Sequence, residues 1–507
     1  MEERVGKGAV VLIISGVICK MLGAFFRLPL TNIIGIKGIG MFQMVMSLYS
    51  LLLVFVSGGV SASLSKLVSS ARADGDQSKI YSYKRMSLIY SMTISFLIGL
   101  IFALLNDKIS ALQGATEGNK SYFLLILLLP LGSGIGVFRG IIQGYENMIP
   151  TAVSQVLEQS MKFITGLLFA FIFGKTNASN GVFGAFLGIT LSEVVAFLYL
   201  VFVMRKRYKT PKSNLKVGKD FFYAVIPLSF ASAINPFTNA IESLSIVSLL
   251  SLAGIESEKA TILYGLQTGV VGALMHFPLI ISLSVAVALL PKLSYLFEKN
   301  DIENQKGLIS QSFNYMWFFL IPLTFGLISI SNVLYPLVYP NVIEEYLNII
   351  LNLTMLSGIS IILSAVMQFV ISLLQAKGCF TEVMVYSIIA GIFKISTLFI
   401  LARIPFINIF AILISNIVFN SILCICGLIN LGKVVKIGAF EFLLPLLSSC
   451  VMVLCVKIIL SLMSGVIGLA ISILGGALIY FVLSFPLSIE IFKTFLSKLK
   501  LKKKNVC

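Results

Sequence analysis

Two basic residues, Lys20 and Arg27, lie inside the first long apolar segment of the chain. An α-helix turns once every 3.6 residues, so positions seven apart share nearly one face, which Thr31 continues. A charge at the bilayer centre costs at least about 2.5 kcal/mol, which makes such residues candidates for a functional site. Two cations beside a hydroxyl suit a phosphate or pyrophosphate. The structural alternative is that Lys20 reaches the membrane surface and that Arg27 pairs with a carboxylate.

An acid inside a later apolar segment, Glu242, follows Asn235, Pro236 and Asn239 in the stretch INPFTNAIE. The spacings of three and four place the two amides and the carboxylate on one helical face. Such oxygens on a proline-interrupted helix can hold Na⁺ or carry a proton. We therefore predict an ion-coupling site at Asn235, Asn239 and Glu242, with a polar helix contact as the alternative.

Other polar residues inside apolar segments extend these two groups. Glu158 and Lys162 are four apart on one helix and are expected to form an ion pair. The lone charges are expected to serve helix packing, to reach the membrane surface or to line a cavity: Glu193, Lys394 and Lys457. The predicted substrate-binding set is Lys20, Arg27, Thr31, Gln43, Arg139, Gln143, Lys162 and Gln267.

Several kinds of chemistry are excluded or disfavoured. The chain has one histidine, His276, no Walker A motif, and seven cysteines without a disulfide pattern. We therefore expect no catalytic residues, no metal site and no cofactor beyond a coupled Na⁺ or proton. A membrane-embedded glycosyltransferase or polymerase would need acids in a large outer loop. The longest such loop, 106–120, offers only Asp107 and Glu117.

The elements that carry these residues are predicted to be membrane-spanning helices. Hydrophobic residues make up 58% of the chain and charged residues 12%, and a helix needs about 20 apolar residues to cross the membrane. Fourteen segments qualify: 8–34, 40–65, 86–105, 121–138, 151–173, 181–204, 221–251, 262–291, 311–335, 347–375, 383–402, 406–431, 440–463 and 466–489. The sequence predicts an all-α polytopic membrane protein.

The basic residues between these segments alternate sides. Of the 38 lysines and arginines, 27 fall on the side that holds both termini, six on the other side, and five within the segments. The positive-inside rule therefore places both termini in the cytoplasm of a bacterial cell, with the chain in its cytoplasmic membrane. The net charge of +17 follows from this bias, so we expect the basic segments to rest on anionic lipid rather than on nucleic acid.

A diverged internal repeat divides the chain. GMFQMV (40–45) resembles GLQTGV (265–270), and RGIIQGYENM (139–148) resembles LLQAKGCFTE (373–382). The expected layout is an N-terminal lobe of six helices, a basic linker, a C-terminal lobe of six helices, two further helices and a basic tail: 1–204, 205–219, 220–431, 432–489 and 490–507. Transporters with such parallel repeats rock one lobe against the other.

Four stretches resemble one family of exporters: KMLGAFFRLPLTNIIG (20–35), GMFQMVMSLYSLLLVFVSGGVSASLSKLVS (40–69), FRGIIQGYENMIPTAVSQVLEQ (138–159) and YGLQTGVVGALMHFPLIISLSVAVALLPKLS (264–294). They are similar to the multidrug/oligosaccharidyl-lipid/polysaccharide (MOP) superfamily, in its stage V sporulation protein B-like branch, which is related to lipid II flippases. The resemblance implies a V-shaped pair of lobes and two last helices that hold a lipid tail. It also implies first-helix cations at Lys20 and, one residue offset, Arg27. The second-helix arginine of those flippases is missing, since Leu53 and Val54 stand near its place.

Together these features predict a flippase for a polyprenyl-pyrophosphate-linked cell-wall precursor, either lipid II or a related lipid-linked oligosaccharide. The expected partners are that anionic lipid-linked glycan, membrane lipids and cell-wall synthesis enzymes. An ion gradient or the membrane potential would reset the lobes. The alternative is a multidrug/cation antiporter of the same superfamily, whose cavity should carry unpaired carboxylates rather than Lys20 and Arg27.

Overall fold

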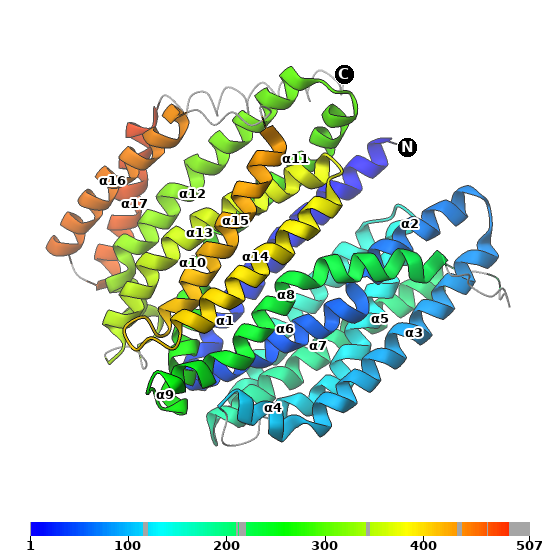
Figure 1. Ribbon diagram of the computed structural model, residues 1–507, viewed down its shortest axis with the longest axis horizontal. Helices are drawn as coiled ribbons and strands as arrows, with labels where there is room; N and C mark the ends of the chain where they lie inside the picture. Colours follow the sequence, from blue (N-terminus) through cyan, green and yellow to red (C-terminus); the bar gives the residue numbers. More distant parts are fainter. Residues whose placement is uncertain are drawn as a thin grey trace. The chain divides into compact units, whose positions relative to one another are not determined.

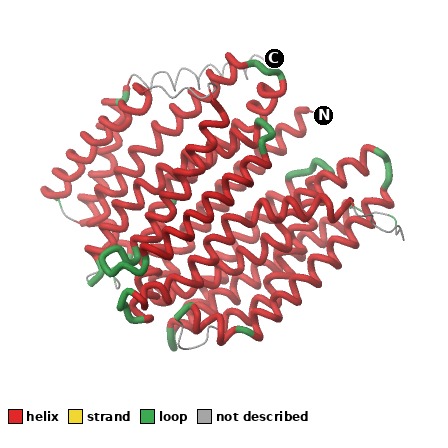
Figure 2. The backbone as a smooth tube through the Cα atoms, in the orientation of Figure 1, coloured by secondary structure: helices red, strands yellow, loops and turns green. Residues whose placement is uncertain are grey.

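Every element in the described part of the chain is a helix (Figure 1, Figure 2). The computed structural model describes residues 2–114, 120–208, 211, 220–340, 345–432, 439–463 and 465–485. Within these residues, 11 helical stretches are long and apolar enough to cross a membrane. The prediction of an all-α polytopic membrane protein is thereby confirmed.

Internal contacts divide the chain into two units. Unit 1 comprises Met1–Ala273 and Ser387–Ser415, and unit 2 comprises Leu274–Tyr386 and Asn416–Cys507. The elements of the first part are α1 (Glu2–Leu53), the π-helical turn η1 (Val54–Gly58), α2 (Gly59–Ala73), α3 (Gln77–Leu104), α4 (Asn106–Leu112), η2 (Lys120–Leu124), α5 (Leu125–Gly144), α6 (Ile149–Gly174), α7 (Ala178–Arg207), α8 (Asp220–Leu252), α9 (Ser257–Gly265), the π-helical turn η3 (Leu266–Val271) and α10 (Gly272–Met275).

The remaining helices belong to unit 2 or cross its boundaries. They are α11 (Phe277–Glu298), α12 (Ile302–Val338), α13 (Leu347–Ala376), α14 (Phe380–Leu401), α15 (Phe410–Leu431), α16 (Ala439–Leu462) and α17 (Gly465–Leu483). The division does not follow the predicted lobe boundary, since α8 and part of α14 fall in unit 1. Most of the 205–219 linker and all of the 490–507 tail lie outside the described residues. The two-lobe layout therefore stays a prediction.

The long helix α1 is broken at Gly35, whose φ of 73° and ψ of 175° are not helical. A positive φ is readily adopted by glycine, because glycine has no Cβ. In Figure 1 the start of α1 and the following helix α2 lie toward the same end of unit 1, so the chain turns back near this break. The first predicted boundary, between segments 8–34 and 40–65, coincides with Gly35.

Two helices begin with an aspartate cap at corresponding positions of the sequence repeat. Asp76 caps α3 by accepting from the backbone N–H of Lys79 at 3.0 Å, and Asp301 caps α12 by accepting from that of Asn304 at 3.2 Å. Hydrogen bonds lower the pKa of both carboxyls below its ordinary value. Asp76 lies 36 residues after Gly40, and Asp301 lies 36 residues after Gly265, which agrees with the spacing of the sequence repeat.

Small residues hold α6 and α7 close together within unit 1. A Cβ at Gly188 would lie 2.4 Å from the backbone N of Gly166, and one at Gly184 would lie 2.3 Å from the carbonyl oxygen of Phe169. The hydroxyl of Thr165 also donates to the carbonyl of Gly188 at 2.8 Å. Close backbone approach through small residues is the usual way in which membrane helices associate. This contact fixes the charged residues of α6 against those of α7.

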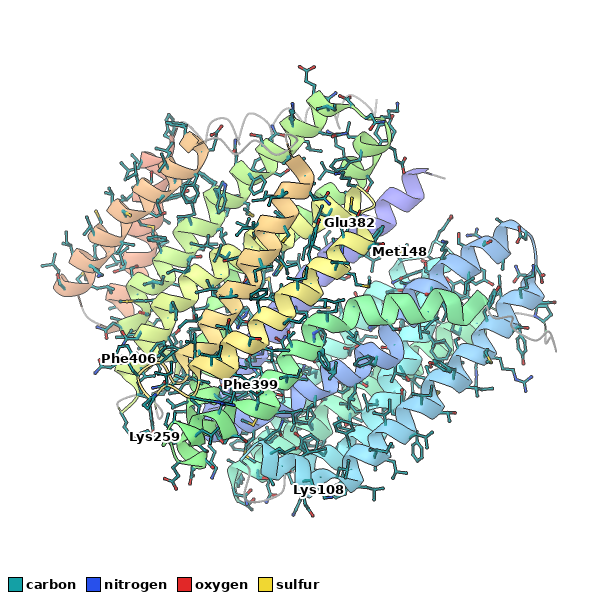
Figure 3. The ribbon with its side chains drawn as sticks, viewed as in Figure 1. Lys108, Met148, Lys259, Glu382, Phe399 and Phe406 are labelled. Atoms are coloured by element: carbon teal, nitrogen blue, oxygen red, sulfur yellow. The ribbon has the colours of Figure 1, made fainter. Side chains whose placement is uncertain are left out.

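Loops that the charge pattern assigns to opposite sides of the membrane lie toward opposite ends of unit 1. Lys108 and Lys259, both predicted to lie outside the cell, are found toward one end of the unit, and Met148, in a loop predicted to lie inside, is found toward the other (Figure 3). The helices between them cross from end to end, as membrane-spanning helices do.

Candidate functional site

Arg27 on α1 faces a second cation from another helix. It lies within electrostatic range of Lys162 on α6, whose Nζ is 5.3 Å from the ring centroid of Phe26. Two like charges near each other on adjoining helices favour an anion between or beside them. Lys20, about two helical turns closer to the N-terminus, is exposed. Thr31 is fully buried and donates to the carbonyl of Arg27 at 2.8 Å, within its own helix.

Arg139 on α5 binds the carboxylate of Glu158 on α6. Its guanidinium is 2.8 Å from Oε2 of Glu158 and donates from Nε to the hydroxyl of Ser154 at 2.9 Å. The predicted partner of Glu158 was Lys162, four residues along the same helix. Glu158 contacts Arg139 instead, because the short turn between α5 and α6 brings a guanidinium, with its planar fork, alongside the carboxylate. Arg139 therefore enters the site as a partner of an acid.

Glu193 on α7 is a buried acid whose role was missed by sequence reasoning. It is 6% exposed, and one carboxylate oxygen accepts a hydrogen bond from the hydroxyl of Tyr49 on α1. In the described part of the chain, the other oxygen is buried without a hydrogen-bond partner. Glu158, Lys162 and Arg139 all act on Glu193 electrostatically. The only sequence signal was an acid in the middle of an apolar segment.

These residues form what we call the N-terminal polar cluster: Arg27, Tyr49, Arg139, Ser154, Glu158, Lys162 and Glu193. Its helices are α1, α5, α6 and α7, all in unit 1. Three cations lie near two carboxylates, so the cluster carries a formal surplus of one positive charge. Arrays of guanidinium and ammonium groups with such a surplus bind phosphate-type anions.

Three of the predicted substrate-binding glutamines lie elsewhere. Gln43 donates from Nε2 to the carbonyl of Thr268 at 3.3 Å, and Gln267 is 8% exposed. Both sit where α1 crosses α9 and η3, since a Cβ at Gly40 would lie 2.5 Å from the carbonyl oxygen of Thr261. The two segments matched by the repeat are thus packed against each other. Gln143 is partly exposed at the end of α5, outside this crossing and outside the N-terminal polar cluster.

The predicted ion-coupling residues meet a lysine from a distant part of the chain. Glu242 is 6% exposed, and its Oε2 is 3.2 Å from Nζ of Lys394 on α14. The same Nζ donates to Oδ1 of Asn239 at 2.7 Å. Asn235 is exposed, and its backbone carbonyl accepts from the hydroxyl of Thr238. We call Asn239, Glu242 and Lys394 the α8–α14 pair site; all three belong to unit 1.

Unit 2 contains an apolar pocket of about 430 Å³ between α12, α16 and α17. Its lining includes Phe318, Leu323, Met452, Val456 and Tyr480. The hydroxyl of Tyr480 donates to the carbonyl of Phe318 at 2.7 Å and so ties α17 to α12. A pocket without charged lining residues suits a hydrocarbon chain.

Comparisons with known proteins agree with these features. The polysaccharide biosynthesis protein family matches residues 5–297. Over 312 residues the chain is 30% identical to stage V sporulation protein B of Bacillus subtilis, covering 59% of each chain. Over 373 residues it is 26% identical to lipid II flippase MurJ of the same organism, covering 67% of this chain and 66% of that one. The alignments thus span about three fifths to two thirds of these relatives.

Solved structures are similar in fold. The inward closed conformation of lipid II flippase MurJ matches with a TM-score of 0.75 at 15% identity, covering 95% of this chain and 100% of the other. An inward-facing multidrug resistance MATE family transporter of the MOP superfamily matches with a TM-score of 0.63 at 13% identity, covering 85% and 95%. Because the family match covers more than half of the chain, the chain belongs to the polysaccharide biosynthesis protein family.

Proposed function

We propose that the protein is a flippase for a lipid-linked glycan with a pyrophosphate headgroup, such as lipid II or a related cell-wall precursor. The observation that carries this proposal is the surplus of positive charge in the N-terminal polar cluster, inside the membrane-spanning helices. Excess positive charge inside membrane-spanning helices is costly without an anionic ligand, so the binding of such a ligand would account for the composition of the cluster. Arg27 and Lys162 hold the pyrophosphate in this proposal, and Lys20 meets it at the approach.

The acids give the cluster a second task. Glu158 holds Arg139 in place, and Tyr49 orients Glu193. Both carboxylates lie close to the cations, so they repel a bound anion and lower its affinity for the cluster. Release of the headgroup then needs only a small rearrangement of helices. A transporter needs such balanced binding, because a substrate that binds very tightly leaves slowly.

The lipid tail would travel outside the cluster. In our proposal the tail lies against α16 and α17, where the 430 Å³ apolar pocket offers a complementary surface. Membrane lipids and cell-wall synthesis enzymes are the proposed partners. The membrane potential is one predicted energy source, and it acts directly on the charges of the substrate without a separate ion site. A Na⁺ or proton gradient is the other.

We further propose fourteen membrane crossings arranged as two lobes. The first apolar stretch, Ile14–Ala73, has 60 residues and is long enough for two crossings, with the break at Gly35 between them. The helix α8 and the run from α9 to α11 would supply two more, beyond the other ten stretches. Cysteine labelling in intact cells should find 106–120 outside and 205–219 inside. External labelling of 205–219 would overturn the count.

The alternative is a multidrug/cation antiporter. The fold likeness to the MATE transporter and the unpartnered oxygen of Glu193 favour it. Against it, the cluster has more cations than acids, and the acid of α8 is paired with Lys394. A cationic drug would therefore meet repulsion at the cluster and an already neutralised carboxylate at the pair site.

The deciding experiment is complementation of a strain depleted of its own lipid II flippase. Expression of this chain should restore growth and the appearance of lipid II on the outer face, measured by surface labelling. The matched control is Arg27→Ala at equal expression, which should fail. Resistance to cationic drugs without any rescue would support the antiporter instead.

A further inference from the structure

The oxygen atoms of α8 that suit a cation already face one that belongs to the chain. Nζ of Lys394 is 2.7 Å from Oδ1 of Asn239 and 3.2 Å from Oε2 of Glu242. The first contact is a hydrogen bond. The second is an ion pair without hydrogen-bond alignment, because Oε2 of Glu242 has no hydrogen-bond partner among the described residues. An ammonium thus stands at the place predicted from the sequence for a dissolved ion.

The position of Lys394 follows from the packing of α14. The buried residues of this helix are Ala390, Gly391, Lys394 and Leu398; Lys394 lies four residues after Ala390, three after Gly391 and four before Leu398, so all four share one face. Gly391 lets α14 approach α8, since a Cβ there would lie 3.1 Å from Cγ2 of Thr238 (Figure 1). Lys394 follows on the same face and is 2% exposed. It is therefore held in the contact and does not reach toward the membrane surface.

An ammonium and Na⁺ place the same demand on such a site. Each carries one positive charge, and each needs oxygen ligands to replace the water lost on burial. Glu242 supplies the negative charge and Asn239 a neutral oxygen, and one cation is enough to neutralise them. A Na⁺ at these oxygens would lie beside the full positive charge of Lys394. The residues present therefore do not fit a bound Na⁺.

We propose that Lys394 is a tethered cation that fills the oxygen site of α8 in place of a dissolved ion. The protein then needs no Na⁺ at Asn239 and Glu242, and removal of the Lys394 side chain opens this site to Na⁺. The inference concerns ion binding alone and does not depend on which substrate is carried.

The test is thermal stability of the purified full chain in detergent, in sodium chloride and in N-methyl-D-glucamine chloride of equal ionic strength. The parent protein should give the same Tm in both salts. Lys394→Ala should be less stable in N-methyl-D-glucamine and should gain about 2 °C or more, saturably, when Na⁺ is added. The double variant Lys394→Ala with Glu242→Gln should lose this response, because the neutral amide no longer attracts Na⁺.

Three outcomes would overturn the proposal: a saturable Na⁺-specific rise in the parent, no Na⁺-specific rise in Lys394→Ala, or an equal rise in the double variant. If Lys394→Ala does not survive purification without Na⁺, the same membranes are solubilised in both salts and the monodisperse fraction is compared. Recovery in Na⁺ supports the tethered cation, and equal loss in both salts contradicts it. Lys394→Arg, which keeps a cation, is the matched control and should show no response to Na⁺.

Discussion

The N-terminal polar cluster and the α8–α14 pair site place charge inside the same unit in opposite ways. The cluster has three cations for two acids, and its central pair is partly open, with side-chain exposures of 16% for Arg139 and 21% for Glu158. The pair site has one cation for one acid, exposed by 2% and 8%. An unbalanced, partly open group suits a ligand that arrives and leaves. A balanced, closed pair suits a permanent contact between helices.

The largest effect expected from this comparison is the loss of transport on removal of Arg27. Arg27→Ala takes away one cation of the surplus, so the cluster falls to charge balance and no longer offsets a pyrophosphate. We expect rescue of the flippase-depleted strain to disappear, with the protein still present in the membrane. Arg27→Lys should keep part of the activity, because an ammonium supplies the charge without the bidentate fork.

If Arg27→Ala at equal expression still rescues growth fully, the N-terminal polar cluster is not a ligand-binding site. The cluster would then be a structural network like the pair site, and the substrate proposal would lose its main support. Lys457→Ala is the matched control, since it removes a membrane-embedded lysine of α16 that has no part in the cluster. Its rescue should equal that of the parent.

The charged residues show which features of the site the sequence predicts and which it does not. Arg27 was found because a charge inside an apolar segment stands out without any knowledge of its neighbours. Lys162 was predicted as the partner of Glu158, since spacing along one helix reveals Lys162 but not the guanidinium of Arg139 on the preceding helix. Lys394 and Glu242 are 152 positions apart, and no periodicity connects them. Residue type and depth were thus predictable, and partners across helices were not.

The next effect concerns stability at the pair site. Glu242→Gln leaves the ammonium of Lys394 buried without its counter-charge, which costs about 3–5 kcal/mol for pairs of this kind. The double variant Glu242→Gln with Lys394→Met should recover most of the loss, because it removes both charges. Thermal unfolding in detergent measures both.

Glu158→Gln is the matched control from the cluster. In this variant Arg139 keeps its hydrogen bond to Ser154 and partial access to water. Glu158→Gln should therefore lose clearly less stability than Glu242→Gln. Equal losses for Glu242→Gln and Glu158→Gln would contradict the distinction between a closed and an open group.

A smaller effect is expected at Tyr49. Tyr49→Phe removes the hydrogen bond to Glu193 and leaves this buried side chain with one hydrogen bond fewer. The free energy of unfolding should fall by about 1–3 kcal/mol. In a Glu193→Gln background the same change should cost less, because a neutral amide loses less on burial than a carboxylate does. The four unfolding midpoints form a double-mutant cycle. Additive effects would mean that the contact contributes no coupling.

The fold itself was more predictable than the contacts, for a reason visible at the repeat. Gly40 and Gly265 are aligned by local sequence, and an aspartate 36 residues after each of them caps a helix, Asp76 in one case and Asp301 in the other. Helix ends depend on nearby residues, which a sequence displays directly. That the two aligned glycines also touch each other depends on how whole helices pack, and a repeat gives no information on that.

The smallest effect should come from Lys37 and Glu258, an ion pair that is 2.8 Å long, like the pair of the cluster, but lies at the surface with side-chain exposures of 44% and 59%. Water screens both charges in the folded and in the unfolded state, so Lys37→Ala should change the free energy of unfolding by no more than about 1 kcal/mol. Added salt should make this change smaller still. Coupling energies from double-mutant cycles should therefore fall from Glu242 with Lys394, through Glu158 with Arg139, to Glu258 with Lys37. Distance cannot produce this order, because the most buried pair is the longest of the three, at 3.2 Å. If the surface pair couples as strongly as the buried one, burial does not control these interactions, and the contrast between the two charged regions has no physical basis.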